Sequence, residues 1–151
     1  MTIIQRLLLA AILALVLPVV AYAQSRDAVK RVALDFGLIG VWAGNCDEPP
    51  SPTNNHATYS LSQAGTITLT YDAGQRYEPT RYAIVGAERI ADDKLSLRED
   101  YLNENQTLEI IVVKANDRIR VWSSKTTDGK VLVQDGVITE NRETRWLQRC
   151  R

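Results

Sequence analysis

The two cysteines are the residues of this 151-residue chain whose types and positions most clearly predict chemistry. Cys46 and Cys150 are the only cysteines, and each follows a tryptophan by four residues. In an oxidising compartment, two such cysteines form a disulfide far more often than a metal site or a nucleophile. A bridge between them would close a loop of about 100 residues, to which the chain-entropy model attributes about 4–5 kcal/mol of stabilisation.

Metal binding and catalysis have little support in the sequence. The only histidine, His56, lies in a polar loop without a carboxylate or thiolate at ligand spacing, so no metal site is predicted. The adjacent carboxylates Asp92-Asp93 and Glu99-Asp100 would point to opposite faces on a strand, and we interpret them as turn and surface residues. We therefore expect no enzyme activity, no catalytic residue and no cofactor.

Three tyrosines form a candidate ligand-binding site. Tyr59, Tyr71 and Tyr82 fall on neighbouring predicted strands, and Tyr71 shares a face with Ile67 and Leu69. If this face lines the interior of a barrel, its apolar wall and few hydroxyl groups would suit a small, partly apolar ligand. Side chains alone can also fill a barrel of this size. A filled core and a ligand cavity are therefore both open alternatives.

The segment before the first strand predicts one short helix. Ser25 can cap a helix over residues 26–36, where apolar side chains recur at positions i, i+3, i+4 and i+7. Gly37 suits the left-handed conformation that ends many helices. We expect this helix to pack against the domain or to plug one end of it.

After this helix the apolar period changes from 3.6 to 2, which is the period of β-strands. Alternating segments such as Thr66–Tyr71 follow one another between turn residues. Gln106–Lys114 is apolar on both faces, and Lys130–Thr139 predicts one strand with a bulge at Asp135-Gly136. The pattern predicts an all-β fold: a single up-and-down antiparallel barrel, or a strongly curved sheet, of about 8–9 strands.

The cysteines restrict how this sheet can close. Cys46 ends the first predicted strand, Val41–Cys46, and Cys150 ends the last, Thr144–Cys150. If these strands are antiparallel, the two ends lie at opposite rims, whereas a disulfide needs Cα atoms about 4.4–6.8 Å apart. Either the two strands run in the same direction, with their tryptophans close together, or Cys46 lies beyond its strand.

The N-terminus predicts a cleaved signal peptide. Arg6 precedes an apolar run from Leu7 to Leu17, and Ala21-Tyr22-Ala23 matches a cleavage site. The apolar run is shorter than the roughly 20 residues that a membrane-spanning helix needs. We expect a signal peptide over residues 1–23, an N-terminal helix over 24–39 and a barrel domain over 40–151. The mature protein would be periplasmic or secreted, without a stable membrane anchor.

The charge balance argues against a polyanionic partner. The chain has 18 basic and 18 acidic residues, and removal of residues 1–23 leaves 17 and 18. The resulting net charge of about −1 creates no field that attracts nucleic acid. We expect no nucleic-acid partner, and no motif identifies a protein partner.

Gly40-Val41-Trp42, placed after the predicted helix and at the start of the first strand, resembles the G-x-W signature of lipocalins. The resemblance implies a small barrel whose tryptophan packs across the closed end, under a basic residue of the last strand. Arg145 or Arg149 would match that residue, and Trp146 would belong to the same end. The mature region as a whole also resembles small exported bacterial barrel proteins of uncharacterised function.

These observations favour an exported, lipocalin-like barrel that binds a small ligand. The alternatives are an exported inhibitor-type barrel that binds a protein, and a structural envelope domain without a ligand. A cavity of a few hundred Å³ would favour the first class. A filled barrel with an exposed apolar loop patch would favour the second, and a filled barrel with an ordinary polar surface would favour the third.

Overall fold

The computed structural model describes residues 24–139 and 141–150. The predicted signal peptide, residues 1–23, lies outside the described residues. Within those residues, no helix has the length and apolar character needed to cross a membrane. The described elements are α2 (Arg26–Phe36), β1 (Gly40–Ala43), β2 (His56–Leu61), β3 (Ile67–Asp72), β4 (Thr80–Ala91), β5 (Lys94–Tyr101), β6 (Gln106–Ala115), β7 (Arg118–Thr126), β8 (Val131–Gln134), β9 (Val137–Ile138), β10 (Arg142–Glu143) and β11 (Leu147–Cys150).

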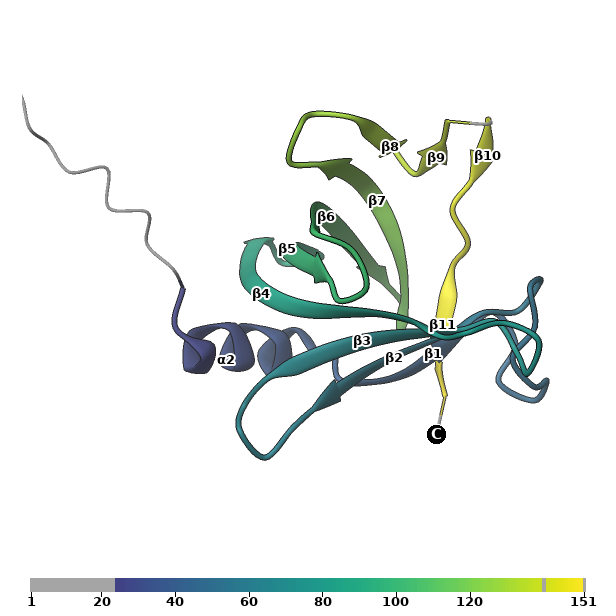
Figure 1. Ribbon diagram of the computed structural model, residues 1–151, viewed down its shortest axis with the longest axis horizontal. Coiled ribbons are helices and arrows are strands. Elements are labelled where there is room, and N and C mark those ends of the chain that lie inside the picture. The colour runs from purple at the N-terminus through teal and green to yellow at the C-terminus, as the bar shows by residue number, and fades with distance from the viewer. Residues whose placement is uncertain (1–23, 140, 151) are drawn as a thin grey trace, which may run out of the picture.

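Eight strands close into an antiparallel barrel (Figure 1). The order around the barrel is β11, β1, β2, β3, β4, β5, β6 and β7, and β7 pairs back with β11. The alternating segment in β3 turns Ile67 and Leu69 into the core, where both are buried, as its period of 2 requires. The predicted all-β barrel with one short N-terminal helix is confirmed.

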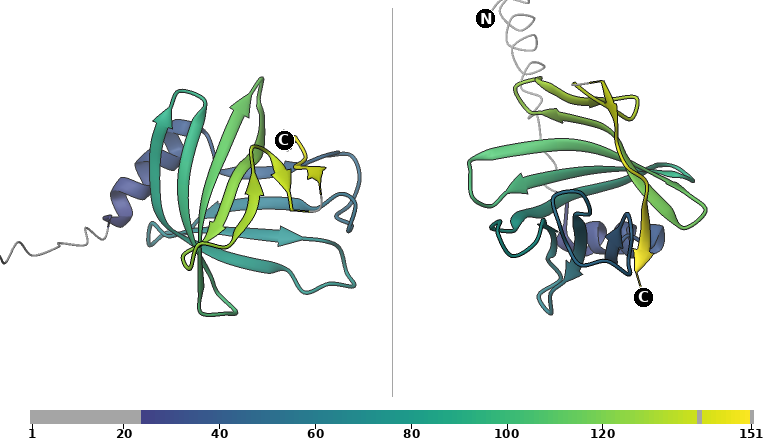
Figure 2. Two further views of the ribbon diagram at one scale, coloured as in Figure 1. Left: turned by 90° about the horizontal axis from the view of Figure 1, so that it is seen from above. Right: turned by 90° about the vertical axis from the view of Figure 1, so that its right-hand side faces the viewer.

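Strands β8, β9 and β10 lie outside the closed barrel and extend from β7. The start of β7 pairs with β11, Ile119 opposite Leu147, whereas its end pairs with β8, Ser124 opposite Val133. Beyond Ile119 the strand therefore leaves β11, and the β8–β10 segment continues the sheet away from the barrel. This segment and α2 lie on opposite sides of the molecule (Figures 1 and 2).

The single bulged strand predicted over residues 130–139 is wrong. Asp135 and Gly136 have φ angles of 51° and 76°, and they separate β8 from β9. Two successive residues with positive φ are typical of a type I′ turn, which joins antiparallel strands through a two-residue loop. The segment is therefore a small hairpin, and the last strand, β11, begins at Leu147 rather than at Thr144.

Helix α2 forms at the predicted residues. The Ser25 hydroxyl accepts a hydrogen bond from the backbone N–H of Ala28, and Gly37 ends the helix with φ 75°. Val29, Ala33 and Phe36 are buried and belong to the same apolar cluster as the inward-facing side chains of the barrel. The helix packs against β4 and lies beside the barrel in Figure 1, so its amphipathic stripe is covered by the domain.

Gln24, just before the helix, binds an irregularity in β4. The register of β4 against β5 shifts between Ile84 and Gly86. The Gln24 side chain donates to the carbonyl oxygen of Ala87 and accepts from its N–H, both at 2.8 Å. A Cβ on Gly86 would lie 3.2 Å from Cβ of Arg98. Strand β4 continues through Gly86 as a bulge.

A disulfide joins Cys46 to Cys150 across the barrel seam, with their Cα atoms 5.4 Å apart. Strand β11 pairs antiparallel with β1, so that Cys150 lies opposite Val41. Strand β1 ends at Ala43, and Cys46 lies in the loop beyond it. Of the two predicted arrangements, the one with Cys46 beyond its strand is confirmed, and the one with terminal strands in the same direction is wrong.

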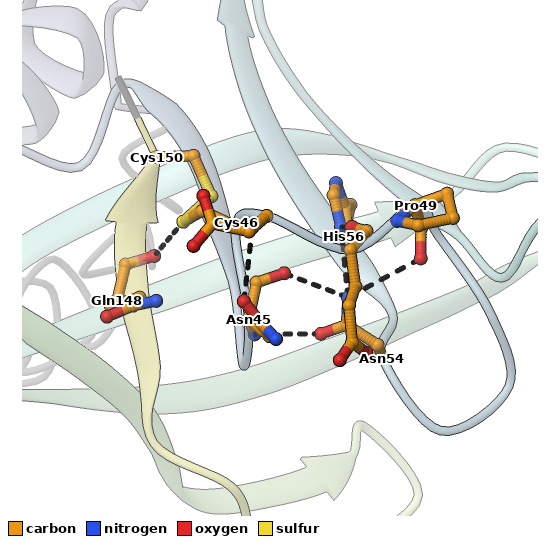
Figure 3. Close-up of a disulfide and its surroundings, with 9 residues drawn as sticks. Asn45, Cys46, Pro49, Asn54, His56, Gln148 and Cys150 are labelled. Atoms are coloured by element: carbon orange, nitrogen blue, oxygen red, sulfur yellow. Dashed lines mark hydrogen bonds between the residues drawn. A yellow bond between two sulfur atoms is a disulfide. The ribbon is translucent and has the colours of Figure 1, made fainter.

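The side chain of Asn54 holds the loop that carries Cys46 (Figure 3). Its Oδ1 accepts from the N–H of Asn45 and its Nδ2 donates to the carbonyl oxygen of Asn45, both at 2.9 Å. Asn54 is buried. His56 belongs to the same network, with Nε2 3.1 Å from the carbonyl oxygen of Glu48. No group of three or more metal-ligating side chains occurs among the residues described.

Replacement of Asn54 by alanine is expected to lower the free energy of unfolding by about 2–3 kcal/mol, because it removes the buried Asn54 amide and leaves part-buried backbone groups of Asn45 unpaired. Urea unfolding monitored by tryptophan fluorescence would measure the loss. The neighbouring Asn55→Ala is the matched control, since this side chain is exposed, and its effect should stay within about 0.5 kcal/mol. Equal losses in the two variants would contradict this role of Asn54.

Candidate ligand-binding cavity

The barrel contains a cavity of about 620 Å³. Its apolar wall comes mainly from β6 and β7, and its mouth is bordered by residues of the β8–β10 segment, the stretch before β11 and the loop before β2. The volume lies within the roughly 300–1,000 Å³ of small-molecule sites. The inward-facing apolar residues of the wall are Leu108, Ile110, Val112, Ile119 and Val121.

All three tyrosines predicted as ligand-binding residues line this cavity. Strand pairing brings them together, because Leu69 of β3 lies opposite both Tyr59 of β2 and Tyr82 of β4. Side chains at opposed positions share a face of the sheet. The rings of Tyr71 and Tyr82 meet edge to face with centroids 6.1 Å apart, and the ring of Tyr101 stacks on Tyr82 at 5.0 Å. The tyrosines form one aromatic wall.

Glu99 of β5 is the residue that the sequence interpretation placed wrongly. It is not a surface residue, because it lines the cavity and is only 1% exposed. Its opposed neighbours are Ile84 of β4 and Leu108 of β6, so the barrel encloses it on both sides. The signal in the sequence was the inward alternation of Leu95 and Leu97, which continues to residue 99 with the period of 2.

The Glu99 carboxyl group has an unsatisfied oxygen. Its Oε1 is buried without a hydrogen-bond partner among the described residues. Burial raises the pKa of Glu99 to about 8, since a charge in an apolar surrounding loses its hydration. At neutral pH and with no ligand, the group is therefore a neutral carboxylic acid.

The tyrosines share this environment. Burial raises the pKa of Tyr59, Tyr71 and Tyr82 above the usual value for a phenol, and the nearby Glu99 raises each further. The four groups therefore lie close enough to interact electrostatically, and the phenols stay neutral over the physiological range. This end of the cavity presents ring faces, hydroxyl groups and one carboxyl group.

Basic side chains lie toward the mouth of the cavity. The Arg120 guanidinium is 5.1 Å from the Trp122 ring centroid and 4.8 Å from that of Trp146. It is also 3.8 Å from the exposed carboxylate of Glu143. Arg145 donates a hydrogen bond to the carbonyl oxygen of Thr53. These contacts connect β7 with the segment that leads into β11 and hold the mouth together.

The predicted barrel-end residues divide between two places. Trp42 is buried, donates from Nε1 to the carbonyl oxygen of Leu38 at 2.7 Å, and has the Arg149 guanidinium 5.8 Å from its ring centroid. Arg149, rather than Arg145, is thus the basic residue that covers this tryptophan. Arg145 and Trp146 do not join it, because Arg145 contacts Thr53 at the cavity mouth and Trp146 contacts Arg120.

The structure at this end explains why residue 40, the first of the G-x-W pattern, is a glycine. Its φ angle is 143°, a conformation that residues with a side chain rarely adopt. A Cβ at this position would lie 3.2 Å from Nε of Arg149. The glycine therefore leaves room for the arginine that covers Trp42 and donates to the carbonyl oxygen of Ile39 at 2.7 Å.

No protein-family model matches the chain, and no curated protein or solved structure matches it.

Proposed function

We propose that this protein is an exported, lipocalin-like barrel that binds a small, partly apolar molecule and performs no catalysis. The observation that carries the proposal is the cavity of about 620 Å³ inside the barrel. Its wall combines apolar side chains with a few polar groups, which is the usual composition of a small-molecule site. The two alternatives, a protein-binding inhibitor and a structural domain, were expected to have a filled barrel.

The surface gives the inhibitor alternative less support. The large apolar side chains that are exposed belong to separate elements and turns rather than to one loop: Leu34, Tyr77, Ile90, Leu102, Val131 and Val137. Scattered apolar residues are normal on a protein surface. The disulfide between Cys46 and Cys150 supports the export part of the proposal, since such bonds persist in oxidising compartments.

A direct test is binding of an uncharged apolar reporter, N-phenyl-1-naphthylamine, followed by its fluorescence. We expect saturable binding at one site per chain. Native mass spectrometry of protein purified without denaturation should also detect any small molecule that co-purifies. The absence of saturable reporter binding would overturn the proposal.

Filling the cavity should abolish this binding. Val121 lines the cavity and is half-buried, so Val121→Trp would place an indole in the space available to the ligand. We expect a loss of at least tenfold in reporter affinity, with a melting temperature close to that of the wild type. Val131→Trp is the matched control, because Val131 is exposed and lies outside the cavity lining. Equal losses in both variants would contradict binding inside the barrel.

A further inference from the structure

We infer that the ligand carries a cationic amine, which binds Glu99 among Tyr59, Tyr71 and Tyr82, and an apolar body that extends toward the mouth. This inference rests on the proposed function and specifies the chemical class of the ligand. It starts from the unpartnered Oε1 of Glu99, which is buried in the cavity wall. A buried polar atom without a partner is costly, so a ligand that supplies a hydrogen-bond donor there has a gain that no purely apolar ligand can obtain.

The charges near Glu99 favour a cationic donor over a neutral or anionic group. Burial is the cause that raises the pKa of Glu99, and no basic side chain of the described residues lowers it. The titratable groups that interact with it electrostatically across the barrel are the phenols of Tyr59 on β2, Tyr71 on β3 and Tyr82 on β4. A cation from the ligand would meet a carboxylate in a medium of low dielectric constant, where the attraction is strong.

The aromatic wall strengthens this preference. Tyrosine ring faces carry negative electrostatic potential and attract ammonium groups placed over them. The rings of Tyr71 and Tyr82 pack edge to face, so their planes differ in direction, and a ligand group would lie beside this pair rather than between the two rings. A carboxylate or phosphate group at this position would meet the negative potential of the ring faces and could form no ion pair with Glu99.

The basic residues near the mouth do not change the expected orientation of the ligand, with its amine at Glu99 and its apolar body toward the mouth. Nε of Arg120 is also buried without a hydrogen-bond partner in the described part of the chain, but its guanidinium group is held between two tryptophan rings and near Glu143. Arg145 donates a hydrogen bond to the carbonyl oxygen of Thr53. Both lie toward the mouth, whereas Glu99 is enclosed by β4 and β6. The ammonium group therefore enters first, and the apolar body lies along Leu108, Ile110 and Val121.

Three ligands of equal chain length test the inference. Octylamine, octanol and octanoate would compete with N-phenyl-1-naphthylamine at pH 8, where the amine is protonated. We expect octylamine to displace the reporter at a concentration at least tenfold lower than either of the others. In Glu99→Gln this preference should disappear while the reporter still binds. The matched control is Glu78→Gln, which removes an exposed carboxylate outside the cavity lining and should keep the preference.

Proton release gives a second readout. At pH 7 the empty site holds a protonated Glu99, so binding of an ammonium group should release close to one proton, roughly the fraction protonated at that pH. Calorimetry in buffers of different ionisation enthalpy would measure the release, which octanol should not produce. Octanol or octanoate displacing the reporter as well as octylamine would overturn the amine inference alone. Failure of the reporter itself to bind would overturn the proposed function.

Discussion

Glu99→Gln is expected to be more stable than the wild type at pH 9, by up to about 5 kcal/mol, with a much smaller difference at pH 5. The usual pKa of a glutamate, 4.5, rises to about 8 in the folded protein, and each pKa unit corresponds to about 1.4 kcal/mol. Between these two values the folded protein binds a proton that the unfolded chain has lost. The free energy of unfolding of the wild type therefore falls as pH rises from about 4.5 to about 8.

The measurement is urea unfolding of both proteins at several pH values from 5 to 9. The difference between variant and wild type removes the contributions of all other titrating groups, provided that they act alike in both. Glu78→Gln serves as the control, since Glu78 is exposed, and its stability should stay within about 0.5 kcal/mol of the wild type. Parallel profiles for wild type and Glu99→Gln would show that Glu99 is not buried as described.

Removal of the disulfide is the second large effect. The double variant Cys46→Ser/Cys150→Ser is expected to lose about 4–5 kcal/mol of unfolding free energy, because the bond spans 104 residues and restricts the unfolded chain accordingly. In the double variant, Asn54 would still hold the loop around residue 46, and β1 would still pair with β11. The loss would appear as a clearly lower denaturation midpoint in urea.

Reductant provides the internal control for this prediction. Wild-type protein treated with dithiothreitol should approach the stability of the double variant, and the double variant should not respond to the reductant. An unchanged midpoint on removal of both cysteines would mean that the disulfide does not stabilise the folded protein. In that case, the hydrogen bonds between β1 and β11 would hold the barrel closed without help from the disulfide.

The elements predicted most accurately depend on neighbours in the chain. The cap at Ser25, the apolar stripe and the left-handed Gly37 all act within four residues, and α2 has the predicted bounds. The residue pair Asp135-Gly136 is compatible with either a bulge or a hairpin turn. In the structure, both residues have positive φ angles and form the turn of a hairpin. The position of Cys46 beyond β1 depended on Asn54, nine residues further along the chain than Asn45.

The candidate site was predictable in its aromatic half and missed in its acidic half. Tyr71 could be placed on an inward face because it alternates with Ile67 and Leu69 on one strand. Glu99 occupies the equivalent position after Leu95 and Leu97, but its residue type argued for the surface, where carboxylates are normally hydrated. Its burial results from Ile84 and Leu108 on the two flanking strands, a contact that no single strand reveals.

By itself the sequence determined the class of fold, the helix, the cysteine pair and the face that Tyr71 shares with Ile67 and Leu69, because these follow from local periodicity and from the small number of cysteines. Whether the barrel is filled or hollow was decided only by the tertiary structure. The cavity depends on how eight strands close and on the point where β7 leaves β11 to pair with β8. Both features depend on the relative positions of segments that are far apart in the chain. The volumes of the side chains, which the sequence does give, therefore do not reveal how much space is left between these segments.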